Sequence, residues 1–215
     1  MPPADPAYNR DTMSGSVETT MTLPFACDQA LKEWAVAIQA LGAGQQALII
    51  RKGGIREDSN KFEVKFPRFL LFPSFEHQQE DLLRPEYATG LVGAMRDDAD
   101  PACLTFTHFA SVHRAFPVTE PEELAALSPH HIWTNEYAEK RLWWRPKQAL
   151  TAMVLRVHRL DEPKHVPVRL EYAGCKSWLQ LLDSVTVDAT TPALSDDDFA
   201  TEAAAIDEAM ASAHA

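Results

Sequence analysis

Apolar residues recur three or four positions apart in several stretches of the chain, a spacing that places them on one face of a helix. This spacing predicts helices over residues 28–41, 133–144 and 175–183. Gly42 and Gly44 follow the first of these stretches, and glycine is a common signal for the end of a helix. The most regular patterns therefore predict three helices that are well separated along the chain.

Capping residues indicate three further helices. Ser74 is placed to begin one, and the capping box Thr119-x-x-Glu122 another. Ser195 precedes an apolar stripe that would let the last helix pack on the rest of the protein; the stripe consists of Phe199, Ala203, Ile206 and Met210.

Short apolar runs and alternating patterns predict strands between these helices. The predicted strands cover residues 46–51, 62–66, 69–72, 103–116, 150–159 and 165–172. Strands and helices do not alternate regularly, which argues against repeated β-α-β units. The sequence therefore predicts a single α+β domain with packed helices and a mixed, partly antiparallel sheet.

Composition divides the chain into three parts. Residues 1–23 are rich in Pro, Ser, Thr and Asp without apolar periodicity, which predicts a disordered leader. The formal charge of the whole chain is −11, yet residues 24–183, the predicted domain, hold 19 basic and 21 acidic residues. Residues 184–215 hold seven acidic residues and no Lys or Arg, so we interpret them as an acidic tail with a possible docking helix. Such a tail can serve solubility, or can cover a basic surface and compete with an anionic ligand.

Several classes of protein are not indicated. No run approaches the roughly 18 apolar residues of a membrane span, and the first residues lack the pattern of a signal peptide, so we expect a cytoplasmic protein without a membrane partner. The three cysteines are far apart and the histidines are scattered, so the sequence indicates no disulfide framework, no metal site and no cofactor.

The densest mixture of aromatic and basic residues lies between Trp133 and Lys147. Tyr137, Arg141 and Trp144 are neighbours on one face of the predicted helix. An exposed face of this kind could stack nucleobases and hold phosphates. Alternatively, the tryptophans belong to the core and the basic groups solvate its rim.

A second group of residues suggests hydrolysis. Glu63 and Lys65, after Glu57 and Asp58, form an acidic-x-Lys pattern that could hold a divalent metal, and His77 could act as a general base. However, 31 acidic residues and 8 lysines in 215 positions predict about one such triplet by chance, and the chain contains two. The exposed charged face of an amphipathic strand explains Glu63 and Lys65 better.

Several segments together resemble a bacterial family known as domain of unknown function 1802. They are Ala30–Trp34, Arg51–Ile55, Phe72–Gln78, Tyr137 with Arg141, Leu155–Val157, and Tyr172–Trp178. The resemblance covers roughly residues 26–183 and implies no established activity. It implies a link to restriction or defence systems, because some relatives occur with a restriction-endonuclease-like domain. The polar positions that it highlights are Lys52, Glu57, His77, Gln78, Arg141, Lys147, Arg156 and Tyr172.

Three functions remain open at the level of the sequence. The first is a module associated with nucleic acid or nucleotides, in which basic residues contact phosphates and aromatic residues stack on bases. Its candidate ligand residues are Lys52, Gln78, Tyr137, Arg141, Lys147, Arg156 and Tyr172, with Trp144 as a further stacking residue. The second is a hydrolase that uses a metal or a histidine base, with Glu57 and His77 as catalytic candidates. The third is a protein-interaction module regulated by the acidic tail.

Overall fold

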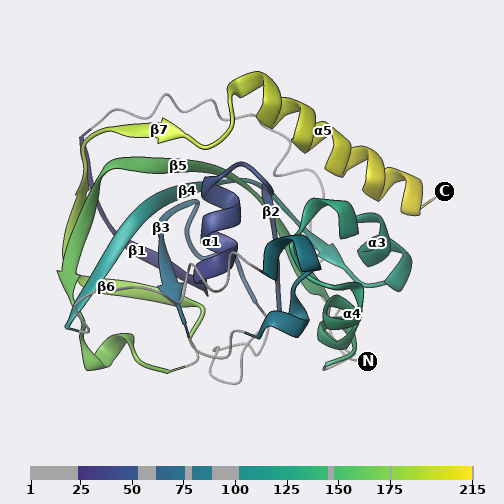
Figure 1. Cartoon of the computed structure of the whole chain (residues 1–215), viewed down its shortest axis with the longest axis horizontal. Helices are drawn as coiled ribbons and strands as arrows, with labels where there is room; N and C mark the ends of the chain where they lie inside the picture. The colour runs from purple at the N-terminus through teal and green to yellow at the C-terminus, as the bar shows by residue number, and fades with distance from the viewer. Residues whose placement is uncertain are drawn as a thin grey trace, which may run out of the picture.

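Two long antiparallel strands form the centre of the fold in the computed structural model of the chain. The strand β4 (Cys103–Val118) pairs with β5 (Leu150–Pro167) along almost its entire length, as Figure 1 shows. The structure describes residues 24–52, 62–75, 79–88, 102–144, 148–174 and 176–214. The predicted leader, residues 1–23, lies outside the described residues.

Shorter strands extend this pair into a mixed sheet of seven described strands, with β2-β5-β4-β3-β1-β6 as its main order and β7 paired with β5. Only β1 and β3 run parallel, and the other pairs are antiparallel. The predicted α+β class with a mixed, partly antiparallel sheet is therefore confirmed. The bounds of the shorter strands are β1 (Phe25–Trp34), β2 (Leu48–Arg51), β3 (Arg68–Ser74), β6 (Trp178–Val187) and β7 (Thr190–Pro192).

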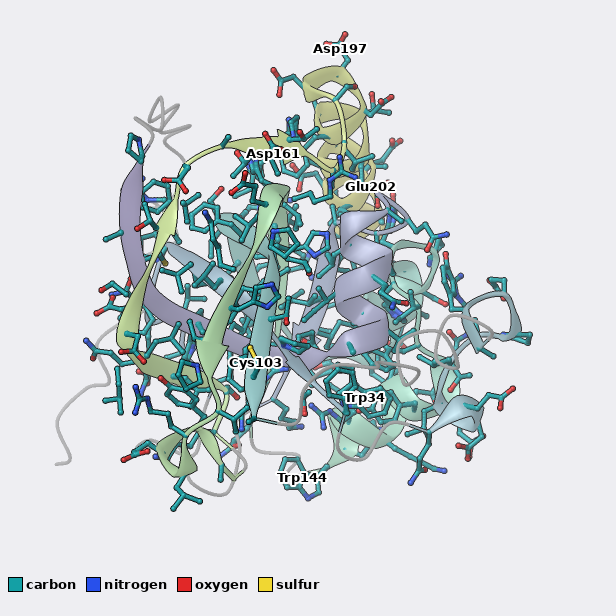
Figure 2. All side chains as sticks on the ribbon, turned by 60° about the vertical axis from the view of Figure 1, so that its left-hand side comes forward. Trp34, Cys103, Trp144, Asp161, Asp197 and Glu202 are labelled. Atoms are coloured by element: carbon teal, nitrogen blue, oxygen red, sulfur yellow. The ribbon has the colours of Figure 1, made fainter. Side chains whose placement is uncertain are left out.

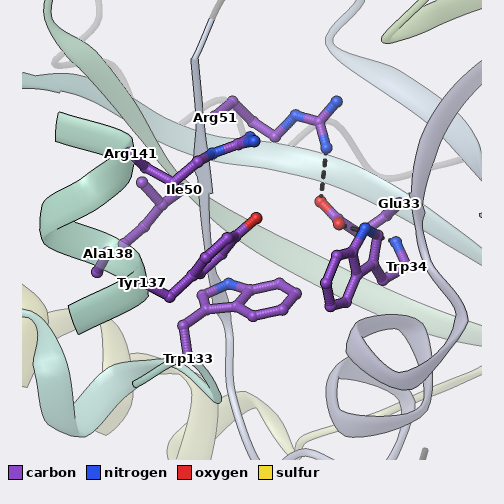
Figure 3. A pocket seen from close by; sticks show the side chains of 8 residues that line it. All are labelled: Glu33, Trp34, Ile50, Arg51, Trp133, Tyr137, Ala138 and Arg141. Carbon is purple, nitrogen blue, oxygen red and sulfur yellow. Dashed lines mark hydrogen bonds and ion pairs between the residues drawn. The ribbon is translucent and has the colours of Figure 1, made fainter. Parts of the chain in front are cut away.

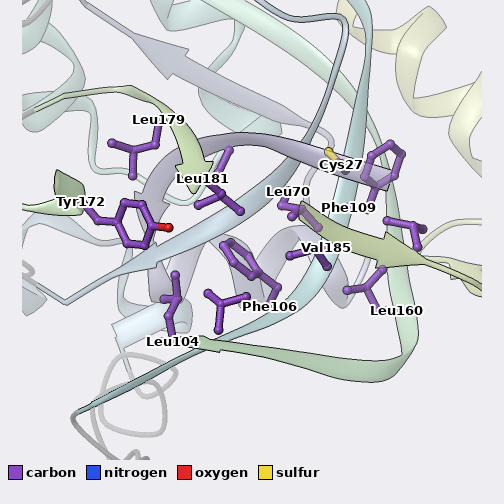
Figure 4. Close-up of a cluster of buried hydrophobic side chains, with 13 residues drawn as sticks. Cys27, Leu70, Leu104, Phe106, Phe109, Leu160, Tyr172, Leu179, Leu181 and Val185 are labelled. Atoms are coloured by element: carbon purple, nitrogen blue, oxygen red, sulfur yellow. The ribbon is translucent and has the colours of Figure 1, made fainter. Parts of the chain in front are cut away.

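Bulges make the sheet curl. The register between β4 and β5 shifts between Phe106 and His108 and again between Val112 and Arg114, and bulges of this kind bend a strand and increase its twist. The curved sheet encloses one buried cluster on its inner side, shown in Figure 4, with residues from β1, β3, β4, β5 and β6. The other side carries a second cluster that includes Ile38 and Leu41 of α1 (Ala35–Gly42).

The remaining helices lie mainly at one end of the sheet in Figure 1. They are α3 (Pro121–Ala126), α4 (Asn135–Trp143) and α5 (Asp196–Ala213), with the 3₁₀ turns η1 (Glu80–Leu82), η2 (Ser128–His130) and η3 (Leu170–Tyr172). The helix α3 begins with a capping box one residue later than predicted, because Glu123 accepts the backbone N–H of Glu120 at 3.0 Å. Among the described residues, no helix is both long and apolar enough to span a membrane.

Sequence periodicity correctly predicts the elements whose pattern is uninterrupted. The strands at 46–51, 69–72 and 103–116 correspond to β2, β3 and β4, and the helix at 133–144 to α4. The strand predicted at 150–159 is confirmed but continues to Pro167 through Asp161-Glu-Pro163. Four residues of β5, 160–163, face the single residue Thr107, and this irregularity accommodates Pro163, which has no N–H to donate.

The helix predicted over residues 28–41 is wrong in its first half. Residues up to Trp34 form β1, and only the second half forms α1. Ala30 and Leu31 are both fully buried, because β1 lies inside the sheet between β3 and β6 and both of its faces are covered. Apolar residues from a strand and from the helix after it happen to fall at helical spacing. The predicted stop is correct, since α1 ends at Gly42 and Gly44 adopts a positive φ of 67°.

The helix predicted over 175–183 is also wrong, because residues from Trp178 onward form the strand β6. Its buried side chains alternate, and they are Leu179, Leu181, Val185 and Val187. Leu182, which helical spacing would place on the same side as Trp178, is exposed. The alternation becomes evident only when the pattern is followed beyond residue 183.

Three smaller predictions also differ from the structure. Residues 62–66 are extended but pair with no strand, and Phe62 is buried. Ser74 is the last residue of β3 rather than a helix cap, and the described residues after it hold only the turn η1 and a helical stretch at 85–88. The strand predicted at 165–172 ends at Pro167, and η3 follows it.

The helix predicted after Ser195 is confirmed, and it packs on the sheet end. Phe199, Ala203 and Ile206 are buried in one cluster with residues of β2, β5, α3 and α4. Charged groups hold the helix as well: Arg114 pairs with Asp207, and His130 lies 2.9 Å from Glu202. Figure 2 shows Asp197 and Glu202 on this helix, with Trp34 and Trp144 at the opposite end of the view. The acidic C-terminal segment therefore contributes to the hydrophobic core.

We predict that Ile206→Ala lowers the free energy of unfolding by about 2–5 kcal/mol, because the fully buried side chain leaves a cavity under α5. Glu208→Ala on the exposed side of the same helix should change it by less than about 0.5 kcal/mol. Equilibrium denaturation of the three proteins checks this. Equal stability of the two variants would show that α5 does not depend on this packing.

We also predict an acid-sensitive step at His131, which is 1% exposed. Burial, with the nearby charges of Arg84 and His130, lowers the pKa of His131 to about 4. An unfolded histidine takes up a proton near pH 6.5, so the unfolded state binds more protons between these values. Stability should therefore fall by up to about 3 kcal/mol as the pH decreases from about 6.5 to about 4.

The variant His131→Gln tests this assignment through the pH dependence of unfolding rather than through stability at one pH. It should flatten the decrease between pH 6.5 and 4. The matched control His165→Gln removes an exposed histidine and should leave the decrease unchanged. An unaltered pH profile in His131→Gln would contradict the prediction.

Candidate functional site

A shallow pocket lies between the end of β1, the strand β2 and the helix α4 (Figure 3). Its volume is about 60 Å³, which is room for about two water molecules at their share of liquid volume. The pocket can therefore take one edge or ring of a flat ligand but not a whole nucleotide. The residues that line it are Glu33, Trp34, Ile50, Arg51, Trp133, Tyr137, Ala138 and Arg141.

Three aromatic rings form one wall of the pocket. The centroids of Trp34 and Trp133 lie 4.8 Å apart with the rings nearly perpendicular, and those of Trp133 and Tyr137 lie 5.1 Å apart. The edge-to-face contact between the two tryptophans is favourable beyond the area that it buries. Both Trp34 and Tyr137 pack against a buried cluster that includes α1 residues and Ile132. The wall is therefore fixed by the core and needs no ligand to assemble.

An ion pair closes the opposite side. The Nη1 atom of Arg51 lies 2.9 Å from Oε2 of Glu33, whose side chain is 5% exposed. Glu33 Oε1 accepts the backbone N–H of Trp34 at 2.8 Å, and Arg51 Nη2 donates to the hydroxyl of Ser177 at 2.9 Å. The pair connects β1, β2 and the segment before β6. Removing either partner would leave a largely buried charge without compensation.

Arg141 is the second guanidinium of the pocket. It follows Tyr137 by four residues on α4, and its guanidinium carbon lies 5.6 Å from the centroid of the Tyr137 ring. Figure 3 shows Arg141 extending over Tyr137 toward Arg51. Within the described part of the chain, Arg141 forms no ion pair. Burial raises the pKa of the Tyr137 hydroxyl, and the charge of Arg141 opposes this only in part, so the ring stays neutral at physiological pH.

Lys52 supports the helix that carries Tyr137 and Arg141. Its ammonium is almost fully buried and donates a hydrogen bond to the carbonyl oxygen of Leu142 in the last turn of α4. A cation at this end of a helix satisfies a free carbonyl and complements the helix dipole. Burial lowers the pKa of Lys52, and the neighbouring Arg141 lowers it further. Lys52 therefore contributes positive charge from behind the pocket rather than a direct contact.

The structure brings together some of the predicted ligand residues and separates others. Tyr137 and Arg141 line the pocket, and Lys52 lies beside it. Arg156 is directed to α5 instead, where it donates to the carbonyl oxygen of Leu194 at 2.8 Å and pairs with Asp196. Tyr172 is buried inside the curved sheet.

Among the described residues, the hydrolase candidates form no assembled centre. Glu63 and Lys65 are exposed on the extended segment 62–66. The described residues contain no group of three or more His, Cys, Asp or Glu side chains that could hold a metal ion. The candidates Glu57, Asp58, His77, Gln78 and Lys147 lie outside the described residues.

Sequence reasoning missed half of the pocket. The pattern placed Trp34 in the core of a helix, although it ends a strand and faces Trp133. Glu33 and Arg51 are 18 positions apart, and nothing in the spacing shows that they pair. The one available signal was a charged residue, Glu33, between two buried apolar stretches, since buried charges require a partner.

Comparison with solved structures finds a distant likeness to the ASCH protein of Zymomonas mobilis. Its crystal structure has 9% sequence identity and a TM-score of 0.41, covering 82% of this chain and 93% of that chain. A mutant of the same protein gives 9% identity and a TM-score of 0.42, with 85% and 98% of the two chains covered. No curated protein sequence matches the chain.

One protein family does match by sequence. Its description is Domain of unknown function (DUF1802), and the match covers residues 30–205. The match extends beyond the resemblance noted at 26–183 into α5, and it includes every residue that lines the pocket. Because the match covers most of the chain, the protein belongs to the DUF1802 family.

Proposed function

We propose that the protein binds a nucleotide unit, free or as part of a nucleic acid, at the pocket between β1, β2 and α4. The observation that carries this proposal is Arg141, a guanidinium that lies over the Tyr137 ring beside an aromatic wall and has no ion-pair partner among the described residues. Aromatic rings next to an available cation suit a ligand that is itself flat and negatively charged. A nucleotide combines both properties.

The aromatic wall supplies the base-binding part of the proposal. Rings such as Tyr137 and Trp34 offer a face or an edge to any nucleobase, and stacking contributes about 1–3 kcal/mol per base. The small volume of the pocket limits the contact to one ring or edge of the base. The sugar and phosphate would then remain outside, toward the exposed surface of α4.

The charges of the pocket supply the phosphate-binding part. Two guanidinium groups and one carboxylate line it, and the ammonium of Lys52 lies behind Arg141. Arg51 is occupied by Glu33 and Ser177, which leaves Arg141 to meet an anion. A guanidinium can donate two parallel hydrogen bonds to a phosphate. The family resemblance implies a link to restriction or defence systems. Such a role would bring the protein to nucleic acid, and it is part of the same proposal.

We predict that Arg141→Ala weakens binding of a fluorescent nucleotide at least about tenfold, the effect of losing one charge-assisted hydrogen bond. Binding is measured by fluorescence anisotropy at several salt concentrations. The dependence of log affinity on log salt should become shallower by about one in the variant.

The matched control is Lys140→Ala, which removes the same charge from the neighbouring position of α4. Lys140 is exposed and pairs with Glu136 at 2.7 Å, away from the pocket lining. The control should retain most of the affinity. Equal losses in the two variants would indicate unspecific attraction to a charged surface, and an absence of nucleotide binding by the unaltered protein would reject the proposed function.

A further inference from the structure

The surface of α4 next to the pocket carries an additional aromatic residue. Trp144, which directly follows α4, is 41% exposed although it is large and apolar. Its N–H donates to the carbonyl oxygen of Lys140 at 3.0 Å, so its backbone continues the helix at this point. The position of this exposed ring relative to the pocket therefore bears on which ligand the pocket binds.

Helix geometry places Trp144 in line with Tyr137 and Arg141. Successive residues of an α-helix turn by about 100° and rise by about 1.5 Å. Tyr137, Arg141 and Trp144 therefore lie within about 60° of one another around the axis, and Tyr137 and Trp144 are about 10 Å apart along it. These three side chains form a row along α4, in the order of the Tyr137 ring, the Arg141 cation and the Trp144 ring.

The adjacent Trp143 does not belong to this row. It is also exposed, at 57%. The same geometry places it about 120° from Tyr137 and about 160° from Arg141, on another side of α4. Trp143 and Trp144 are thus both exposed, but only Trp144 lies on the side of α4 that carries Tyr137 and Arg141.

The row of Tyr137, Arg141 and Trp144 favours single-stranded over double-stranded nucleic acid. Stacked bases in one strand of a duplex are about 3.4 Å apart, whereas the Cα atoms of Tyr137 and Trp144 are separated by about 10 Å along the helix axis. The row is therefore long enough for two consecutive bases, one at each ring. Bases in a duplex are also covered on both faces by their neighbours, so only an unpaired strand can offer them to protein rings.

We propose that the ligand of this site is single-stranded nucleic acid that spans at least two nucleotides. One base contacts the wall at Tyr137, the phosphate that joins the two nucleotides contacts Arg141, and the next base stacks on Trp144. This inference rests on the proposed function, because it extends the same pocket along α4. It goes further in naming the strandedness of the ligand and a second base-binding position.

The test compares the affinities of a mononucleotide, a dinucleotide, a single-stranded decamer and a duplex decamer, each labelled and titrated at one salt concentration. The unaltered protein should bind the dinucleotide and the single strand at least about fivefold more tightly than the mononucleotide, the lower end expected for one additional stacked base. The duplex should bind more weakly than the single strand.

Variants assign the gain to one residue. Trp144→Ala should remove the advantage of the dinucleotide and leave the mononucleotide affinity unchanged, whereas Trp143→Ala should leave both unchanged. Arg141→Ala should weaken all of the single-stranded ligands. Thermal unfolding of each variant confirms that the fold is retained, and both tryptophans are exposed, so their removal should not disturb the core.

Two kinds of result are distinguishable. The inference is overturned if the dinucleotide binds no more tightly than the mononucleotide, if the duplex binds as tightly as the single strand, or if the two tryptophan variants behave alike. In each of these cases, mononucleotide binding that depends on Arg141 would still support the proposed function. If no ligand binds the unaltered protein, the proposed function fails, and the inference fails with it.

Discussion

The pairing of β4 with β5 is the constraint on which the rest of the structure depends. All other strands attach to this pair directly or through a neighbour: β2 and β7 to β5, β3 to β4, and β1 and β6 beyond β3. The bulges in the pair curl the sheet, and the curled sheet encloses a core on its inner side. The same arrangement brings the ends of β1 and β2 close enough for Glu33 and Arg51 to form their ion pair.

The pocket is built mainly from groups that also stabilise the protein. Its rings belong to the cluster around α1, and its ion pair joins three segments of the chain. Lys52 holds the last turn of α4 by a buried hydrogen bond. Arg141 differs from these groups, because it packs on a ring without using its hydrogen-bonding capacity on a described residue. A rigid frame that presents one available cation is typical of a binding surface whose shape exists before its ligand arrives.

The acidic C-terminal segment has a different role from the one that charge alone suggests. Its helix α5 buries an apolar stripe, and its carboxylates pair with groups of the domain such as Arg114 and Arg156. No described residue of α5 lines the pocket. The negative charge of α5 therefore lies beside α3 rather than in the lining of the pocket.

The sequence by itself determined the fold class, the long strand β4, the helix α4 and the docked helix α5, because each of these elements has one uninterrupted period of apolar residues. It did not separate β1 from α1, since Leu31 of the strand and Ile38 of the helix fall at helical spacing by coincidence. It highlighted Tyr137 and Arg141, which are neighbours on one helix. Only the tertiary structure decided that Glu33, Arg51 and Trp34 join them, because contacts between separate strands leave no regular spacing in the sequence.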